Sequence, residues 1–577
     1  MRTILLLTIL MPLVAHAAGH RLLLAHNGHS RYRIVVADNA APATKRAATE
    51  LQRFFKEMTG TELKIVSDRA PASYFQIHLG DRAAAKTLGD EGYTLKTVGN
   101  HLVITGRGPR GTMYGVYGLL EDHLGCRWFT PQVSRIPRYR TLRLRSLDER
   151  VVPVLEYRDP FVFDCLDADW SARNRMNGSW QLTTEHGGGV RFGTGLFVHT
   201  FNVLVPPDQY FAAHPEYFAE INGQRVKDQT QLCCTNEEVI RLVIAALRER
   251  IRQDPDATVY SVSQNDWGNH CQCAPCRQLA EQEGTPAAPL LHLVNEVARA
   301  FPDKTIETLA YQWSRKPPRT MKPLANVIIR LCSIECCFSH PLDECRRQEN
   351  RAFVADLQGW TRLCDRLWVW NYETNFAHYL LPFPNYHVWD ANIRFFVRHH
   401  VRGLLTQDNY QSPNGELSAL GGYVRAKLLW NPDADAHRAT DEFLAGVYGA
   451  AAKPIRAYLD LLTRKVVAEN LHIHINDPPV TAYLTEDILT RADALWDEAE
   501  AVVAGDAATL ERVRVARASL DYAFIERARQ SGQPILLARV ARFAHAIETG
   551  GITRFREGNG EMESYLKALK PVRTSPP

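Results

Sequence analysis

The stretch TVYSVSQNDWGNHCQCAPC, residues 258–276, decides how the rest of the chain is organised. It begins with β-forming residues that show no helical period, and it then turns abruptly at Asn265, Asp266, Trp267 and Gly268. An amide, an acid and an indole therefore stand together where a buried strand meets its loop. Asn and Asp also cap helices and shape turns, so a structural role for this pair stays open.

Eight apolar strand candidates follow one another between residues 154 and 429, and amphipathic helices separate most of them. The strands are expected at 155–163, 196–201, 231–235, 258–266, 305–312, 327–335, 367–372 and 403–408. The helices are expected at 237–252, 286–301, 347–363, 386–399 and 415–429. This order predicts an α/β fold, a (β/α)8 TIM-like barrel whose first two connections are irregular.

Composition limits the partners of this barrel. The chain has 577 residues, which predicts two to four domains, and 45% hydrophobic with 23% charged residues is typical of a globular protein. A net charge of +4 with scattered basic residues gives no electrostatic reason to expect nucleic acid as a partner. The 11 Trp and 21 Tyr supply flat faces that stack on sugar rings, although core packing uses the same residues. The pattern does not indicate an oligomeric state.

Four segments divide the chain. Residues 1–17 are expected to be a cleavable signal peptide, because an arginine precedes an apolar run too short to span a bilayer and Ala-His-Ala follows. We therefore expect a periplasmic or secreted protein with no membrane span. Residues 18–149 alternate strands with helices and predict a small α/β domain, and 150–432 are expected to form the barrel. Residues 433–577 are expected to form a helical domain, with helices at 439–447, 454–470, 485–504, 507–528 and 535–549.

Polar and aromatic residues gather at the predicted carboxyl ends of the strands, where α/β barrels bind their ligands. A carboxylate, a neutral hydrogen-bonding group and an aromatic face suit a carbohydrate. The candidate binding residues are Arg158, His199, Trp267, Tyr311, Trp313, His340, Trp370, Asn371, Tyr372 and Glu373, and the candidate catalytic residues are Asp266, Asn265 and Glu335. Structural alternatives stay open, since Arg158 could pair with Asp159 and His199 could be a satisfied core histidine.

The cysteine cluster has two interpretations. Cys271-x-Cys273-x-x-Cys276 could begin a zinc site, with a fourth ligand from Cys332, Cys336, Cys337 or Cys345. In an exported protein the same residues could form disulfides that brace the loops after the fourth and sixth strands. We favour disulfides at this point, and we expect neither a catalytic metal nor a cofactor, because the sequence has no HExxH motif.

Two sets of motifs resemble known families. GPRGTMYGVYGLLEDHLGCRWFTP, residues 108–131, resembles the small domain that precedes the catalytic barrel in α-glucuronidases and β-hexosaminidases. SVSQNDWGNHCQCAPC (261–276), LAYQW (309–313), IECCFSHPL (334–342), VWNYETNFAHYLLPFPN (369–385) and GELSALGGYVRAKLLWNP (415–432) resemble a bacterial family of domains of unknown function, number 4838. Part of that family is classed as glycoside hydrolase family 163.

The resemblance implies an endo-β-N-acetylglucosaminidase that attacks complex N-glycans. In such a retaining enzyme the acetamido oxygen of the substrate acts as the nucleophile, so the protein supplies an acid and a group that orients the acetamide. We expect Asp266 to be the acid and Asn265 the orienting group, with Glu335 and then Glu373 as rival acids. The alternatives are an inverting, α-glucuronidase-like glycosidase that uses Asp266 and Glu335 with water between them, and a non-catalytic glycan-binding protein.

Overall fold

The computed structural model describes residues 21–80 and 86–569, and the expected signal peptide at 1–17 lies outside them. The chain divides into two compact units. One comprises the residues up to Cys126 together with Ile136–Val152, and the other comprises Arg127–Arg135 and everything from Pro153 onward. Within the described ranges, no helix is long and apolar enough to cross a membrane.

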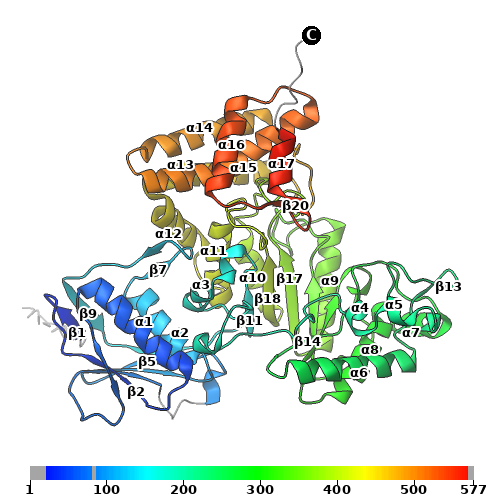
Figure 1. Cartoon of the computed structure of the whole chain (residues 1–577), viewed down its shortest axis with the longest axis horizontal. Coiled ribbons are helices and arrows are strands. Elements are labelled where there is room, and N and C mark those ends of the chain that lie inside the picture. Colours follow the sequence, from blue (N-terminus) through cyan, green and yellow to red (C-terminus); the bar gives the residue numbers. More distant parts are fainter. Residues whose placement is uncertain (1–20, 81–85, 570–577) are drawn as a thin grey trace, which may run out of the picture. The chain divides into compact units, whose positions relative to one another are not determined.

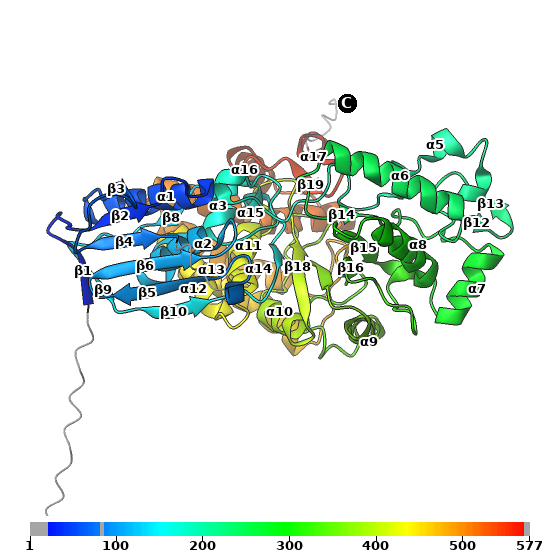
Figure 2. The ribbon, with the colours of Figure 1, turned by 90° about the horizontal axis from the view of Figure 1, so that it is seen from below.

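The first unit is built on a six-stranded mixed sheet of order β10-β5-β6-β4-β2-β3 (Figure 2). Its strands are β2 (Arg33–Val36), β3 (Lys64–Ser67), β4 (Gln76–Leu79), β5 (Tyr93–Val98), β6 (His101–Gly106) and β10 (Asp148–Val151). Helix α1 (Pro42–Thr59) buries an apolar face, and helix α2 (Gly111–Gly118) contacts β5 and β6. A Cβ atom on Gly118 would lie within 3 Å of the Tyr93 ring, so glycine permits this close approach.

The second unit contains a six-stranded parallel sheet of order β11-β18-β17-β16-β15-β14, which forms a half-barrel (Figure 1). Its strands are β11 (Tyr157–Asp159), β14 (Tyr260–Ser261), β15 (Ile306–Ala310), β16 (Val327–Cys332), β17 (Leu367–Tyr372) and β18 (Val401–Gln407). The accompanying helices are α6 (Glu237–Gln253), α8 (Ala287–Ala300), α9 (Gln348–Leu363), α10 (Trp389–Arg398) and α11 (Ser418–Trp430). Every residue of β15, β16 and β17 is buried, as expected for a parallel sheet covered on both faces.

The second and third strands of the expected eight are not strands in the structure, so the parallel sheet has six strands in the described residues. In segment 196–201, His199 adopts a positive φ of 55°, which breaks the extended backbone before α4 (Phe201–Leu204) begins. In segment 231–235, the Gln231 side chain forms two hydrogen bonds with the backbone of Asn265. Its Oε1 accepts from the Asn265 amide, and its Nε2 donates to the Asn265 carbonyl. Side-chain bonds thus replace a strand ladder there.

A helical region follows the sheet within the second unit (Figure 1). Its helices are α12 (Ala436–Tyr448), α13 (Ala452–Ala468), α14 (Glu486–Val502), α15 (Ala507–Ser531), α16 (Leu537–Thr549) and α17 (Met562–Leu569). A short hairpin, β19 (Arg554–Arg556) with β20 (Gly560–Glu561), precedes the last helix.

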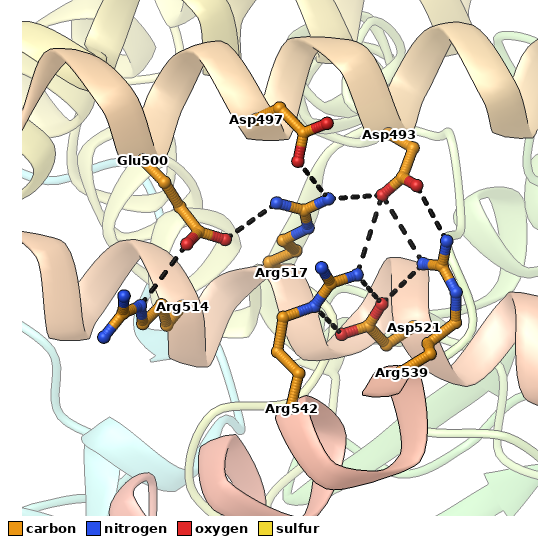
Figure 3. A network of polar contacts seen from close by, with 8 residues as sticks. All are labelled: Asp493, Asp497, Glu500, Arg514, Arg517, Asp521, Arg539 and Arg542. Atoms are coloured by element: carbon orange, nitrogen blue, oxygen red, sulfur yellow. Dashed lines mark hydrogen bonds and ion pairs between the residues drawn. The ribbon is translucent and has the colours of Figure 1, made fainter. Parts of the chain in front are cut away.

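An ion-pair network joins α14, α15 and α16 (Figure 3). The Arg517 side chain, only 3% exposed, pairs with Asp493 and Glu500 at 2.5 and 2.8 Å. Asp521 on α15 pairs with Arg539 on α16 at 2.6 Å. Breaking a buried pair typically costs about 3–5 kcal/mol, so this network specifies how the three helices pack.

Candidate functional site

A pocket of about 450 Å³ lies at the carboxyl ends of the parallel strands. Its lining residues come from the six strands of the parallel sheet or the segments after them, from the irregular segment 196–201 and from the β19–β20 hairpin. They are Phe161, Trp180, Phe197, Val198, His199, Asp266, Leu309, Tyr311, Cys332, Ile334, Trp370, Tyr372, Gln407, Tyr410 and Glu557. Five of the thirteen predicted site residues are among them: His199, Asp266, Tyr311, Trp370 and Tyr372.

Asp266 presents its carboxylate to this pocket, with 56% of the side chain exposed. The Tyr311 hydroxyl donates a hydrogen bond of 3.0 Å to Asp266 Oδ1, and His199 Nε2 lies 4.0 Å from the same oxygen. Nδ1 of His199 lies 2.9 Å from the Gln264 carbonyl oxygen and must donate to it, which leaves Nε2 facing the carboxylate. Burial, followed by the charge of Asp266, raises the pKa of Tyr311, so the phenol stays a donor.

Asn265 does not reach the pocket although it precedes Asp266. Its side-chain amide donates to the Asn202 side chain and to the Thr230 carbonyl, both at 2.8 Å, and Oδ1 accepts from the Asn202 backbone. Asn265 is 4% exposed. Asn265 is therefore held on the buried side of the loop after β14, and Asp266 beside it lines the pocket.

Glu557 supplies a second carboxylate to the pocket. Trp370 Nε1 donates to Gln407 Oε1 at 2.8 Å, and Gln407 Nε2 donates to Glu557 Oε1 at 3.0 Å. Partial desolvation raises the pKa of Glu557, and the negative charge of Asp266 raises it further. The hydrogen bond from Gln407 lowers this pKa, but the net shift is upward. A carboxyl group whose pKa is raised beside a second carboxylate is the arrangement in which one acid keeps its proton.

Aromatic rings form one wall of the pocket. Phe161 stacks on Tyr410 with a centroid distance of 4.5 Å and meets Trp180 edge-on at 5.7 Å. Trp370 stacks with Tyr372 at 6.1 Å. Trp180 is 50% exposed, an unusual position for so large an apolar ring. Flat faces of this kind pack against the apolar faces of sugar rings.

A buried ion pair lies among these rings. Arg330 and Glu307 have fully buried side chains and pair at 2.7 Å. The Arg330 guanidinium also donates to the Phe197 carbonyl at 2.6 Å and lies 4.8 Å from the centre of the Trp370 ring. Two lining residues are thereby fixed by a group that does not itself line the pocket.

The two rival acids are not among the lining residues. Glu335 pairs with Arg315 at 2.6 Å, and Arg315 also binds Asp356. Glu373 is buried and accepts bonds of 2.8 Å from the side-chain amides of Asn371 and Asn385. Burial raises the pKa of Glu373 to about 7, against the opposing charge of Arg425.

The remaining predicted residues also lie outside the pocket. Arg158 is fully buried and donates to the Arg175 carbonyl. Trp313 donates through its indole to the Trp267 carbonyl and stacks on His270. His340 lies beside Cys337, and the Asn371 side-chain amide donates a hydrogen bond to Glu373.

Sequence reasoning missed Glu557 and the aromatic wall. Glu557 follows the last predicted helix, in the segment RFREGNGE (554–561), where an acid sits between a buried-type aromatic and turn-forming glycines. That hairpin signal could have been noticed, but nothing in it indicates which part of the sheet it meets. Trp180 and Tyr410 lie in loops without a period.

The expectation of disulfides was wrong. All twelve cysteines lie within the described residues, and none of them forms a disulfide. Two clusters of ligand-type atoms replace the expected bonds: Cys233, Cys271, Cys273 and Cys276 in one, and Cys337, His340, Cys345 and His472 in the other. Cys233 was not among the expected partners of the cluster at 271–276.

A second, larger hollow of about 760 Å³ lies against α12 and α15. It is lined partly by Phe163, Asp164, Leu166, Pro413–Gly415 and Phe443, and it contains none of the predicted strand-end residues. The smaller pocket is therefore the candidate active site.

Several solved structures match this chain. A family 115 4-O-methyl-α-glucuronidase with specificity for decorated arabinogalactans matches with a TM-score of 0.55 and 12% identity, over 93% of this chain and 78% of that one. The Clostridium perfringens family 89 enzyme matches with a TM-score of 0.49 and 12% identity, over 89% and 65%. Flavobacterium johnsoniae chitobiase matches with a TM-score of 0.45 and 11% identity, over 95% and 97%. At 12% identity the likeness to the family 115 enzyme concerns the fold alone.

Family comparisons cover both units. No curated protein matches this chain. Residues 24–119 match the N-terminus of glycosyl hydrolase family 67, in agreement with the likeness to α-glucuronidases expected from residues 108–131. Residues 128–460 match the domain of unknown function DUF4838, more than half of the chain, and the protein therefore belongs to the DUF4838 family.

Proposed function

We propose that this protein is an exported glycoside hydrolase, a retaining, substrate-assisted endo-β-N-acetylglucosaminidase that cleaves complex N-glycans. The observation that carries the proposal is the pair of carboxylates, Asp266 and Glu557, in one aromatic-walled pocket. Two carboxyl groups in unlike settings are what glycoside hydrolysis requires. The pocket volume of about 450 Å³ lies within the usual range for small-ligand sites.

The proposed fold is a complete (β/α)8 barrel in which irregular backbone occupies the second and third strand positions. Supporting contacts come from segment 196–201: the amides of Thr200 and Phe201 both donate to the Ser263 carbonyl, just beyond β14. This arrangement explains why His199 and Asp266 face the same pocket.

The two carboxyl groups have different proposed roles. Glu557, whose pKa is raised, holds a proton and gives it to the departing glycosidic oxygen. Asp266 accepts hydrogen bonds, as its contact with Tyr311 illustrates, and accepts the N–H of the substrate acetamide. Asn265 is excluded from this orienting role by its own buried bonds.

In the first step, the acetamido oxygen attacks the anomeric carbon as the bond to the leaving oxygen breaks and Glu557 transfers its proton to that oxygen. This closes an oxazolinium ring, whose N–H stays hydrogen-bonded to the Asp266 carboxylate. In the second step, water attacks the anomeric carbon, gives its proton to Glu557 and reopens the ring to the acetamide. Both substitutions invert the anomeric carbon, so the overall reaction retains its configuration.

An inverting, α-glucuronidase-like glycosidase is the second candidate, and the match of residues 24–119 to glycosyl hydrolase family 67 favours it. The charge of the pocket opposes it. Lysine and arginine are absent from the described residues that line the pocket, while the Asp266 carboxylate would repel a uronate. A non-catalytic glycan-binding protein is the third candidate.

The test is a panel of complex N-glycans, aryl β-N-acetylglucosaminides and aryl α-glucuronides, with a thiazoline analogue of the oxazoline as inhibitor. We expect release of an N-glycan fragment with retained configuration, and inhibition by the thiazoline. Turnover of the glucuronide alone, without thiazoline inhibition, would place the inverting candidate first. Glycan binding without any turnover, unchanged in Asp266→Asn and Glu557→Gln, would indicate a binding protein.

A further inference from the structure

Four buried cysteines converge beside the loop that carries Asp266. Cys271 and Cys273 lie in that loop, Cys276 lies in the first turn of α7 (Ala274–Glu283), and Cys233 comes from the segment 231–235. The four Sγ atoms all lie within 4.8 Å of one another. Cys233 Sγ is 3.5 Å from Cys273 Sγ and 3.9 Å from Cys276 Sγ.

These distances distinguish the possible states of the thiols. A disulfide requires sulfurs about 2.0 Å apart. Four thiolates at about 2.3 Å from a tetrahedral zinc ion lie about 3.8 Å from one another, which matches the spacing of this cluster. We propose that Cys233, Cys271, Cys273 and Cys276 bind a structural zinc ion.

The surroundings of the cluster suit thiolates. The Glu220 backbone amide lies 3.4 Å from Cys271 Sγ, and the Arg225 guanidinium lies 3.6 Å from the same atom. The Thr235 hydroxyl lies 3.1 Å from Cys276 Sγ. Four thiolates around Zn²⁺ carry a net charge of −2, and these donors, one of them cationic, offset it.

This zinc ion has a structural role. Four sulfurs complete its coordination, so no position remains for water or substrate. None of the four cysteines lines the candidate active-site pocket. The cluster instead joins the loop after β14 to the segment of Gln231, whose side chain donates to the carbonyls of Asn265 and Trp267 on either side of Asp266.

A second cluster carries the same inference independently. His472 Nδ1 lies 3.2 Å from Cys337 Sγ and 3.8 Å from Cys345 Sγ, and His340 Nδ1 lies 3.4 Å from Cys337 Sγ. His340 Nε2 donates to the Asn470 side-chain oxygen at 3.1 Å, so its Nδ1 carries a lone pair. The Ser339 hydroxyl lies 3.2 Å from this Nδ1 but donates to the Leu471 carbonyl at 2.6 Å, which leaves the lone pair for a metal. Two thiolates and two imidazoles in this arrangement form a Cys2His2 zinc site.

The second site joins two distant parts of the chain. Cys337, His340 and Cys345 lie in the loop after β16, and His472 lies between α13 and α14. Each zinc ion thus braces one loop at the carboxyl end of the sheet. The protein is expected to hold two zinc ions per chain.

The test measures metal content on the full-length protein, purified without chelator, by plasma mass spectrometry. The expected zinc content is two per chain, falling to one in Cys233→Ser and one in His472→Gln. Matched controls keep both ions: Cys234→Ser, a buried neighbour outside the cluster whose thiol lies near the Leu232 carbonyl, and His474→Gln, which pairs with Asp477. Cobalt(II) exchanged into the native protein should show thiolate-to-metal charge-transfer absorption.

Titration of the native protein with an organomercurial keeps the inference testable if a variant does not fold, because modification of the thiols must release zinc in proportion. Native protein without zinc, with a mass lower by two hydrogens per disulfide, would overturn the assignment in favour of disulfides. Iron in place of zinc would overturn the choice of metal. Loss of zinc from the control variants as well would overturn the choice of ligands.

Discussion

The carboxyl ends of three strands of the parallel sheet, β14, β16 and β17, are followed by similar residues but have different roles. Each is followed by an acid: Asp266 after β14, Glu335 after β16 and Glu373 after β17. Asp266 reaches the pocket, whereas Glu335 is held by a guanidinium and Glu373 by two side-chain amides. Position at a strand end is therefore not enough to make an acid available.

The difference lies in which neighbour is anchored. Beyond β14, Asn265 takes the buried bonds, and Asp266 is left to project into the pocket. At the end of β17, the Asn371 side-chain amide donates to Glu373, so amide and acid satisfy each other. A buried carboxylate without hydrogen bonds destabilises the fold. Asn371 removes that cost for Glu373 at the end of β17, whereas Asn265 bonds elsewhere and leaves Asp266 available beyond β14.

Replacement of Asp266 should have the largest effect on this comparison. We expect Asp266→Asn to lose about 10²- to 10⁴-fold in kcat/KM, with poor and good leaving groups alike, because the acetamide must be oriented whatever departs. Kinetics with a natural glycan and with an activated aryl glycoside measure this. If Asp266→Asn instead kept its activity on the aryl glycoside, Asp266 would be the general acid, as the sequence alone suggested.

Glu557→Gln should have a different effect from Asp266→Asn, because its cost depends on the leaving group. We expect a loss of roughly 10²-fold or more on the natural glycan and little loss on an aryl glycoside, since a good leaving group needs no proton. Activity of the native protein should fall as pH rises through the raised pKa of Glu557, and this alkaline limb should be missing in Glu557→Gln.

Asp266→Asn offers a matched check on that assignment. The charge of Asp266 raises the pKa of Glu557, so its removal should move the alkaline limb of the residual activity to lower pH. An unchanged limb would show that Glu557 is not the group that titrates.

Much of the fold follows from local patterns. Helices such as α6, α8 and α9 lie within a few residues of their expected bounds, because a 3.6-residue apolar period and a polar cap are local features. Segment 196–201 misled because LFVHTF has strand-like composition. Its geometry depends on a positive φ at His199 and on bonds to Ser263, which lies far along the chain.

The candidate site also has a part that could be predicted from local sequence and a part that could not. The strand-end rule selected His199, Asp266 and Tyr311, which line the pocket together. It could not select Glu557, because a hairpin after five helices brings that carboxyl group to the sheet. It also could not reject Glu335, since Arg315, the residue that holds it, follows a different strand.

The pH dependence of stability should report the protonation of the buried Glu373 carboxyl. Glu373 has a folded pKa of about 7, above its ordinary value near 4.5, so its contribution to stability is complete below pH 4.5 and is lost as pH rises through 7. Denaturant unfolding at pH 5 and pH 8 should show a smaller fall in stability for Glu373→Gln than for the native protein, by roughly 1–3 kcal/mol. An equal fall in both would mean that Glu373 is ionised throughout.

Glu335→Gln should have the smallest effect. Its side chain is 36% exposed, and a solvent-screened pair of this kind contributes about 1 kcal/mol or less, so stability should barely change. Activity should stay within about threefold of the native value, because the carboxylate faces Arg315 and not the pocket. Asp356→Asn is the matched control, since it removes the other carboxylate on the same guanidinium. A large loss of activity confined to Glu335→Gln and to substrates with poor leaving groups would show that Arg315 releases Glu335 when substrate binds. The contrast between the ends of β14 and β16 would then hold for the unliganded protein alone.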